Sequence, residues 1–144
     1  MIELTSDTDL RRAWPVLAEL RSHLDKHAYM QLLGTMRSEG YRLFALDDGA
    51  GITALAGVGI GTNFYYGKYL WVYDLVTTEA ERSSGRGASL MRDLENFART
   101  EGCDTIALAS GLHRKDAHRF YEDRLGYERA SYTFRKTLGE SSEG

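Results

Sequence analysis

The chain has 144 residues, a formal net charge of −3 and 42% hydrophobic residues. This length fits one domain, and the hydrophobic share is enough to build a core. The acidic balance argues against a nucleic-acid partner, and no apolar run is long enough to suggest a membrane span. The opening "MIELTSDTDL" has neither the basic nor the apolar region of a secretory signal, so we expect a cytoplasmic protein.

The first forty residues predict one short strand and two helices. Residues 2–5 read as the strand, and the capping side chains of "SDTD" introduce a helix in "LRRAWPVLAEL". Pro15 predicts a break or restart in this helix, because proline lacks the N–H that a helix interior needs. The second helix is expected over 25–40, ending at Gly40, with one apolar face formed by Tyr29, Leu32, Leu33 and Met36.

The middle of the chain predicts three antiparallel strands. Two strands, 41–48 and 52–64, are joined by the turn "DDGAG". The third strand, 69–77 ("YLWVYDLVT"), is long, aromatic and β-branched, which is typical of a central strand. Simple alternation along this strand puts the side chains of Tyr73 and Asp74 on opposite faces of the sheet.

The last part of the chain predicts a parallel crossover. A helix over 86–101 has an apolar face and leads into a strand over 104–110, so strand 69–77 begins a right-handed βαβ unit. A helix over 114–126 and a last strand, or a bent pair of strands, over 127–138 follow. The predicted class is therefore α/β (an α+β mixed sheet) in one domain over 1–138, with residues 139–144 as a mobile tail.

The loop "RSSGRG" (82–87) lies between the central strand and the helix that follows it. A helix N-terminus presents unpaired N–H groups to an anion, and Gly85 and Gly87 let the backbone approach closely. Arg82 and Arg86 add positive charge. The alternative is an ordinary surface loop with solvated arginines. The loop lacks the Lys-Ser/Thr pair of a Walker A motif and the third glycine of the dinucleotide-binding fingerprint.

A second motif follows in "AHRFYEDRLGYE" (117–128), where a Phe-Tyr pair precedes Leu-Gly-Tyr. Arg-x-x-Gly-x-Gly followed by Ala-x-x-Phe-Tyr-x-x-x-Leu-Gly-Tyr resembles the GCN5-related N-acetyltransferase (GNAT) superfamily, over about the last eighty residues. The resemblance implies a central mixed sheet whose parallel pair is splayed, flanked by about four helices. It also implies an acyltransferase that uses acetyl-CoA as a co-substrate.

The resemblance implies where acetyl-CoA binds. Its pyrophosphate would lie on the loop formed by Arg82, Ser83, Ser84, Gly85, Arg86, Gly87 and Ala88. Its pantetheine arm would bind free backbone groups of Leu75, Val76 and Thr77. Two positions depart from the common family pattern: Ser83 stands where a glycine is frequent, and Arg114 stands where an asparagine often contacts the cofactor.

The implied reaction is direct attack of a primary amine, on a small molecule or a peptide, at the thioester. Tyr121 matches the family tyrosine near the sulfur, and a phenol protonated at neutral pH can donate to the leaving thiolate. Asp74, on the central strand, is the candidate base; its alternative role is a hydrogen-bonded acid that ties down a loop. The backbone N–H near Val76 is the candidate donor to the developing oxyanion.

Two further expectations concern partners. The single Cys103 and the four scattered histidines show no ligand spacing, so we expect no metal. The resemblance is compatible with a homodimer and leaves the acceptor amine open. The alternative function is a non-catalytic acyl-CoA-binding sensor or interaction domain.

Overall fold

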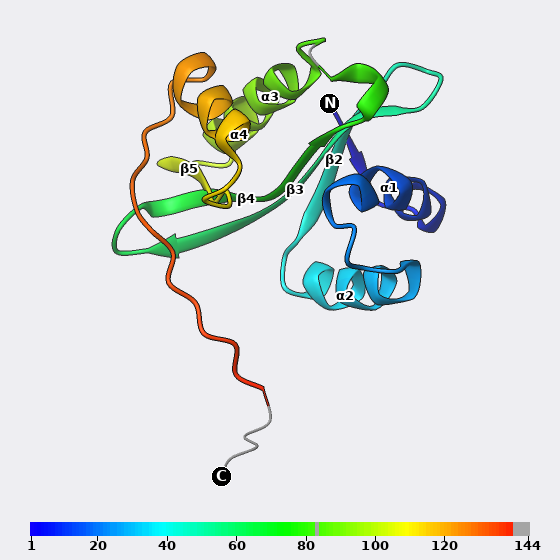
Figure 1. The fold of residues 1–144 in the computed structure, drawn as a ribbon, viewed down its shortest axis with the longest axis horizontal. Helices are drawn as coiled ribbons and strands as arrows, with labels where there is room; N and C mark the ends of the chain where they lie inside the picture. The colour runs from blue at the N-terminus through cyan, green and yellow to red at the C-terminus, as the bar shows by residue number, and fades with distance from the viewer. Residues whose placement is uncertain (83, 140–144) are drawn as a thin grey trace. The chain divides into compact units, whose positions relative to one another are not determined.

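The fold was analysed in a computed structural model, which describes residues 1–82 and 84–139 (Figure 1). Its five strands are β1 (Ile2–Leu4), β2 (Arg42–Asp47), β3 (Ile52–Asn63), β4 (Gly67–Thr77) and β5 (Thr105–Leu108). They form one sheet in the order β1-β2-β3-β4-β5. The pairs from β1 to β4 are antiparallel, and β4 and β5 are parallel. The predicted mixed sheet is confirmed.

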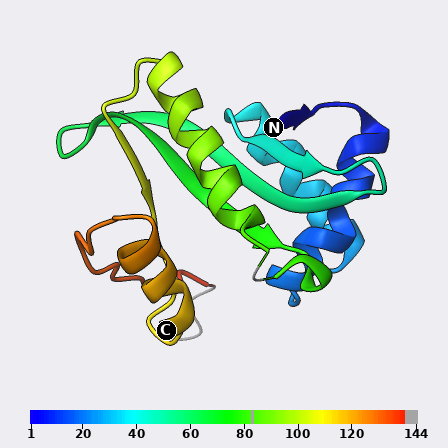
Figure 2. The same ribbon diagram turned by 90° about the horizontal axis from the view of Figure 1, so that it is seen from above.

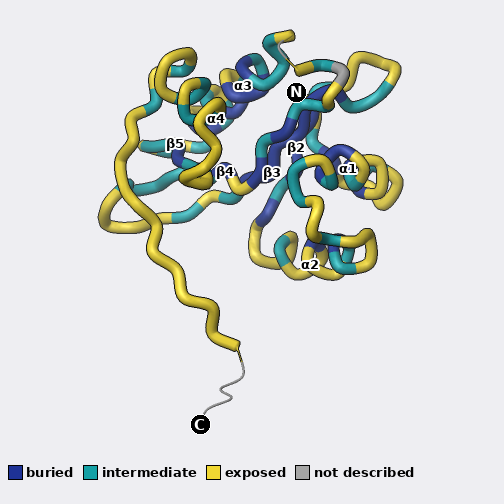
Figure 3. Tube along the Cα trace, in the orientation of Figure 1, coloured by how far each residue is buried: buried dark blue, intermediate teal, exposed yellow. Residues whose placement is uncertain are grey.

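Helices cover both faces of this sheet (Figures 1 and 2). Helices α1 (Asp7–Leu20) and α2 (Lys26–Ser38) pack on one face, where they enclose Leu43, Leu55 and Val76 of the sheet. Helix α3 (Arg86–Thr100) covers the other face, and its Phe97 ring lies 5.0 Å from the Phe44 ring of β2. Figure 3 shows the buried backbone concentrated along β2, β3, β4 and α3.

Helix α1 is continuous through Pro15, so the predicted break is wrong. The helix starts at Ser6, whose hydroxyl accepts a hydrogen bond from the Asp9 N–H at 3.1 Å. Pro15 removes one helical hydrogen bond but is exposed, while Leu10, Ala13, Val16 and Leu17 on either side of it are buried. The burial of this apolar face outweighs the missing bond.

A β-bulge in β4 puts the side chains of Tyr73 and Asp74 on the same face of the sheet, contrary to the prediction. Gly57 pairs with Asp74 and Val58 pairs with Val72, so Tyr73 is an extra residue on β4. The Tyr73 ring lies 5.6 Å from the Tyr41 ring, and the Tyr41 hydroxyl donates a hydrogen bond to Asp74. Both side chains therefore lie on the face that carries α1 and α2. The prediction of opposite faces is wrong because a bulge interrupts strict alternation.

The parallel pair β4–β5 is short and then opens. Its register joins only Tyr69–Val72 of β4 to Thr105–Leu108 of β5. Strand β4 continues to Thr77, and in the described part of the chain its last five residues have no strand partner on that side. This is the predicted splayed pair.

Residues from Ala109 onward form a second unit, separate from the unit Met1–Leu108 that holds the sheet. It contains α4 (Lys115–Arg119), which continues directly into the π-helical turn η2 (Phe120–Arg124). Gly126, with φ of 75°, ends this segment as predicted. The single predicted helix is thus two short elements.

The strand predicted over 127–138 is absent from the described residues, so this prediction is wrong. A strand needs a neighbour for its N–H and C=O groups, and none of the described strands pairs with this segment. Its apolar side chains are exposed, Phe134 to 94%. Of the predicted tail, residues 140–144 lie outside the described residues. No helix in the described ranges has the length and apolar character needed to cross a membrane.

Candidate active site

Asp74 is buried on β4 and fully engaged by two partners. Its Oδ2 accepts a hydrogen bond from the Tyr41 hydroxyl at 2.7 Å, and its Oδ1 accepts one from Arg21 Nε at 2.8 Å. The Arg21 guanidinium also donates to the carbonyl of Tyr73 at 2.9 Å. Arg21, the C-cap residue of α1, thus fastens the end of that helix to the bulge of β4.

The tyrosines around this carboxylate stay protonated. Burial, and then the charge of Asp74, raise the pKa of Tyr41 far above its ordinary value, and burial raises that of Tyr29 to about 12. Tyr41 is therefore a permanent hydrogen-bond donor to Asp74 at any physiological pH. This contact needs a glycine beside it, because a Cβ added at Gly57 would lie 1.7 Å from the Tyr41 hydroxyl oxygen.

The end of β4 runs from the bulge toward the start of α3. Leu75 and Thr77 are half-buried, while Val76 is 7% exposed and packs in the core under α1 and α2. The Thr78 N–H donates to the Thr53 carbonyl at 3.0 Å, which fixes the strand end to β3. The three residues predicted to bind the pantetheine arm thus lie on the stretch of β4 that β5 leaves unpaired.

The loop before α3 has the geometry of an anion site. Gly85 is the N-cap residue of α3 in the left-handed conformation (φ 85°), and no atom lies within 4 Å of the position its Cβ would take. The Gly85 carbonyl accepts from the Ser89 N–H at 3.0 Å. The N–H groups of Arg86, Gly87 and Ala88 precede that bond, so they lack a helical acceptor four residues back. Ser83 lies outside the described residues.

Both loop arginines are held by carboxylates. Arg82 pairs with Glu19 of α1 at 3.4 Å, and Arg86 pairs with Glu81 at 3.6 Å. Glu19 also accepts a hydrogen bond from the Glu79 N–H at 3.0 Å. Exposed ion pairs of this kind contribute little free energy, so a phosphate can displace either carboxylate at small cost.

Tyr121 lies in η2, within the second unit, and is half-buried. Its ring contacts those of Phe120 and Tyr127, with centroids 5.3 and 6.0 Å away. Burial raises the pKa of the Tyr121 phenol, and the nearby Arg114 charge opposes that rise. Its hydroxyl makes no hydrogen bond among the described residues, which leaves this proton available to another acceptor.

Arg114 is the N-cap residue of α4 and lines a hollow in the second unit. The hollow, of about 390 Å³, is bounded by His113, Arg114, Lys115, Asp116 and Ala117. The lining includes the cations of Arg114 and Lys115, which suit a phosphate, beside the carboxylate of Asp116.

Sequence reasoning missed Arg21 and Tyr41. They lie 53 and 33 residues from Asp74 along the chain, and no local spacing connects them to it. No cluster of metal-binding side chains occurs in the described ranges of the chain.

The mixed sheet with its open parallel pair, followed by the glycine-containing loop at the start of α3, defines a class, the acyltransferases. The chain belongs to the acetyltransferase (GNAT) family, whose model matches residues 7–127, and it is an acetyltransferase enzyme. A similar protein is the uncharacterized N-acetyltransferase YhdJ of Bacillus subtilis (strain 168), 42% identical over 139 residues, which cover 96% of this chain and 98% of that protein.

Solved structures share this fold. A transcriptional regulator from Bacillus halodurans C-125 superposes with a TM-score of 0.80 at 21% identity, over 93% of this chain and 96% of that one. An aminoglycoside N-acetyltransferase in complex with CoA gives a TM-score of 0.79 at 13% identity, over 93% of this chain and 91% of that one. At these identities the likeness establishes the fold alone.

Proposed function

We propose that the protein transfers the acetyl group of acetyl-CoA to a primary amine of a small molecule or peptide by direct attack. The observation that supports this proposal most is the opening of the parallel pair beyond Val72: within the described part of the chain, no strand pairs with this edge of β4 from Tyr73 to Thr77. An extended pantetheine arm carries amide groups that can pair with such an edge. The unpaired stretch ends close in sequence to the loop before α3.

The residues proposed to hold acetyl-CoA fall into three groups. Backbone groups of Leu75, Val76 and Thr77 pair with the pantetheine arm. The loop from Arg82 to Ala88 takes the pyrophosphate, supported by the free N–H groups at the start of α3 and the open space at Gly85. Arg114, beside the basic hollow of the second unit, supplies a further phosphate contact.

The proposed chemistry assigns one role to each of three groups. A backbone N–H near Val76 donates to the oxygen that becomes negative when the amine attacks the thioester carbon. Asp74 accepts the proton that the attacking nitrogen must lose, directly or through water. Tyr121 donates its proton to the sulfur as the carbon–sulfur bond breaks; burial raises its pKa, and its hydroxyl has no hydrogen-bond partner among the described residues, which supports this role.

Acetyl-CoA should raise the melting temperature of the protein. A ligand that binds only the folded state adds about 2.7 kcal/mol to the free energy of unfolding at ~100 times Kd. Thermal shift measures this binding, and release of CoA thiol in the presence of an amine panel measures turnover. Binding without turnover of any amine contradicts catalysis and identifies an acyl-CoA-binding sensor; no shift at millimolar acetyl-CoA contradicts the cofactor assignment.

Replacing Gly87 by valine should weaken acetyl-CoA binding without destabilising the fold. A branched side chain in the first turn of α3 blocks close approach of the pyrophosphate, while valine has a somewhat better helix propensity than glycine. Calorimetric titration gives the Kd, and urea unfolding gives the stability. The matched control is Gly34→Val in α2, where nothing lies within 4 Å of the added Cβ. Equal affinities for Gly87→Val and wild type refute the loop assignment.

We also propose that the protein acts in the cytoplasm and as a homodimer. Exposed apolar side chains between residues 127 and 138 support a second copy as partner. Tyr132, Phe134 and Leu138 are separated by even numbers of residues, so in an extended segment they can face the same side and be covered together. Sedimentation velocity at micromolar concentration distinguishes the dimer from a monomer.

A further inference from the structure

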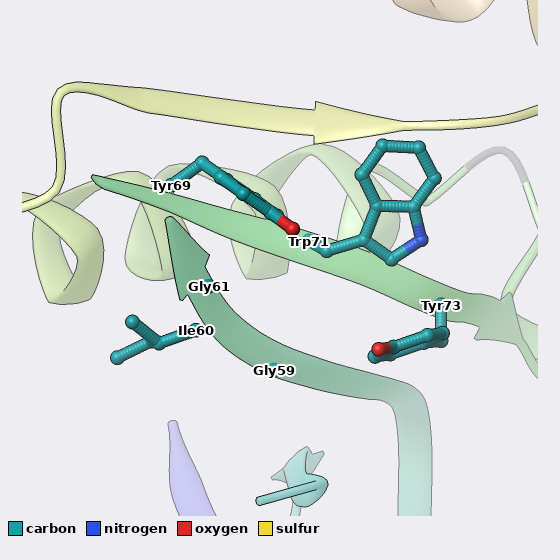
Figure 4. A pocket seen from close by; sticks show the side chains of 6 residues that line it. All are labelled: Gly59, Ile60, Gly61, Tyr69, Trp71 and Tyr73. Carbon is teal, nitrogen blue, oxygen red and sulfur yellow. The ribbon is translucent and has the colours of Figure 1, made fainter. Parts of the chain in front are cut away.

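A groove lined by aromatic rings runs along β3 and β4 in the unit that holds the sheet (Figure 4). Its volume is about 340 Å³, and its lining residues are Gly59, Ile60, Gly61, Tyr69, Trp71 and Tyr73. We call these six residues the aromatic groove. Its volume is at the lower end of the range for small-molecule sites, roughly 300–1,000 Å³.

The groove follows from the sequence of the two strands. Leu70 and Val72 of β4 are buried, so Tyr69, Trp71 and Tyr73 project from the opposite face. The β3 residues paired with Trp71 and Tyr69 are Gly59 and Gly61. The rings occupy the space that these glycines leave: a Cβ on Gly61 would lie 2.6 Å from the Tyr69 hydroxyl oxygen, and one on Gly59 would lie 3.1 Å from the Tyr73 ring.

One end of the groove reaches the candidate base. Tyr73 lies on the face of Tyr69 and Trp71, and the bulge puts Asp74 on that face as well. The Tyr73 ring contacts the Tyr41 ring at 5.6 Å. The Tyr41 hydroxyl is bonded to the Asp74 carboxylate. A molecule lying along the rings therefore has one end next to the Tyr41–Asp74 pair.

The lining selects against highly charged or sugar-like molecules. None of its six residues carries a charge, and its polar side-chain atoms are two tyrosine hydroxyls and one indole N–H. A polycation or a polyhydroxylated amine would lose hydrogen bonds to water there without replacement. A flat ring gains by packing on the aromatic faces.

We propose that the aromatic groove binds the acceptor, and that this acceptor is a primary amine joined by a short chain to an aromatic ring. The ring lies against Trp71 and Tyr73, and the amine lies at the Asp74 end. This inference rests on the proposed function, because it names the substrate class of that site. The half-exposed Tyr73, at 48%, is then an open binding surface rather than part of the core.

The first test uses the full-length protein, saturating acetyl-CoA and three amines: 2-phenylethylamine, butylamine and the aminoglycoside kanamycin. We expect kcat/KM to be highest for 2-phenylethylamine, about tenfold or more above butylamine, which corresponds to the stronger end of an aromatic contact. Kanamycin or butylamine used as well as 2-phenylethylamine overturns the proposal.

The second test uses Trp71→Ala and the milder Tyr73→Ala, with Tyr65→Ala as control because Tyr65 is exposed on the loop outside the groove. Both groove variants should lower kcat/KM for 2-phenylethylamine about tenfold through KM, leave the Kd of acetyl-CoA unchanged, and have little effect on butylamine. The control should match wild type. An unchanged KM in folded Tyr73→Ala overturns the proposal.

Direct binding separates this proposal from the proposed function. Titration of 2-phenylethylamine in the presence of CoA is followed by calorimetry in wild type and in both groove variants. If 2-phenylethylamine binds, both variants weaken its binding and no amine is turned over, the groove is supported as a binding site and catalysis is refuted. Turnover of other amines, with 2-phenylethylamine neither bound nor acetylated, refutes the groove and keeps the acetyltransferase.

Discussion

Tyr121→Phe should lower kcat about 100-fold and leave the Kd of acetyl-CoA almost unchanged. General-acid catalysis contributes roughly 10²–10⁴-fold, and a thiolate is a fairly good leaving group, so the lower end applies. The lost interaction exists only as the carbon–sulfur bond breaks, which is why binding of the cofactor is spared. Stability should change little, because the ring contacts with Phe120 and Tyr127 remain. Initial rates of CoA thiol release give kcat, and calorimetric titration with acetyl-CoA gives its Kd.

The pH dependence gives Tyr121→Phe a second readout. An acid acts only while it is protonated, so the rate of the wild type is present below the pKa of the phenol and is lost as pH rises through it. Burial raises this pKa, which moves the alkaline limb above the ordinary tyrosine range. The variant should lack that limb. Tyr132→Phe, which removes an exposed hydroxyl of the same unit, is the control. Wild-type turnover with an intact alkaline limb would make Tyr121 a packing residue only.

Local patterns predicted the fold where the chain itself carries the signal. The apolar spacing of α3 fixed its buried face, since Leu90, Met91 and Leu94 have no exposed surface. The long apolar run of β4 indicated a central strand, and it pairs on both sides over Tyr69–Val72. Gly40, Gly102 and Gly126, each with positive φ, lie where helix ends were expected. These features depend on neighbours within a few residues.

The errors arose where distant contacts decide the outcome. Helix α1 tolerates Pro15 because the sheet buries its other side, which the local sequence does not record. The bulge at Tyr73 depends on the register between β3 and β4. Residues 127–138 alternate as a strand does, but strand formation needs a partner that the described chain does not offer.

The candidate site shows the same division. Short motifs indicated the loop at Gly85 and Gly87 and the turn at Tyr121, because the role proposed for each depends on its own backbone or on one side chain. The surroundings of Asp74 were not predicted, since Arg21 and Tyr41 reach it from α1 and from the residue before β2. The aromatic groove also combines two strands. The role of its glycines depends on their pairing with Tyr69 and Trp71, which spacing along one strand does not show.

Asp74→Asn should separate the two roles that its contacts allow. An amide oxygen can keep the hydrogen bond from Tyr41 but takes up no proton, so the base is lost; the amide NH2 group then faces the Arg21 donor, and that contact is lost as well. If Asp74 accepts the proton of the attacking amine, kcat should fall roughly 10²-fold or more, with the Kd of acetyl-CoA unchanged. Because the Asp74 carboxylate is buried, loss of its contact with Arg21 should also cost roughly 1–3 kcal/mol in the free energy of unfolding.

Gly57→Ala is the matched opposite change, because it disturbs the same contacts while the carboxylate stays. The added Cβ would lie 1.7 Å from the Tyr41 hydroxyl oxygen, so the Tyr41 ring must move away from Asp74. Overpacking of this kind costs roughly 1–3 kcal/mol in the free energy of unfolding. Urea unfolding should therefore show losses of similar size for Gly57→Ala and Asp74→Asn, while kcat should show the larger loss for Asp74→Asn. Near-normal kcat in Asp74→Asn would assign Asp74 to holding α1 against β4, and the amine proton would then leave through water or another side chain.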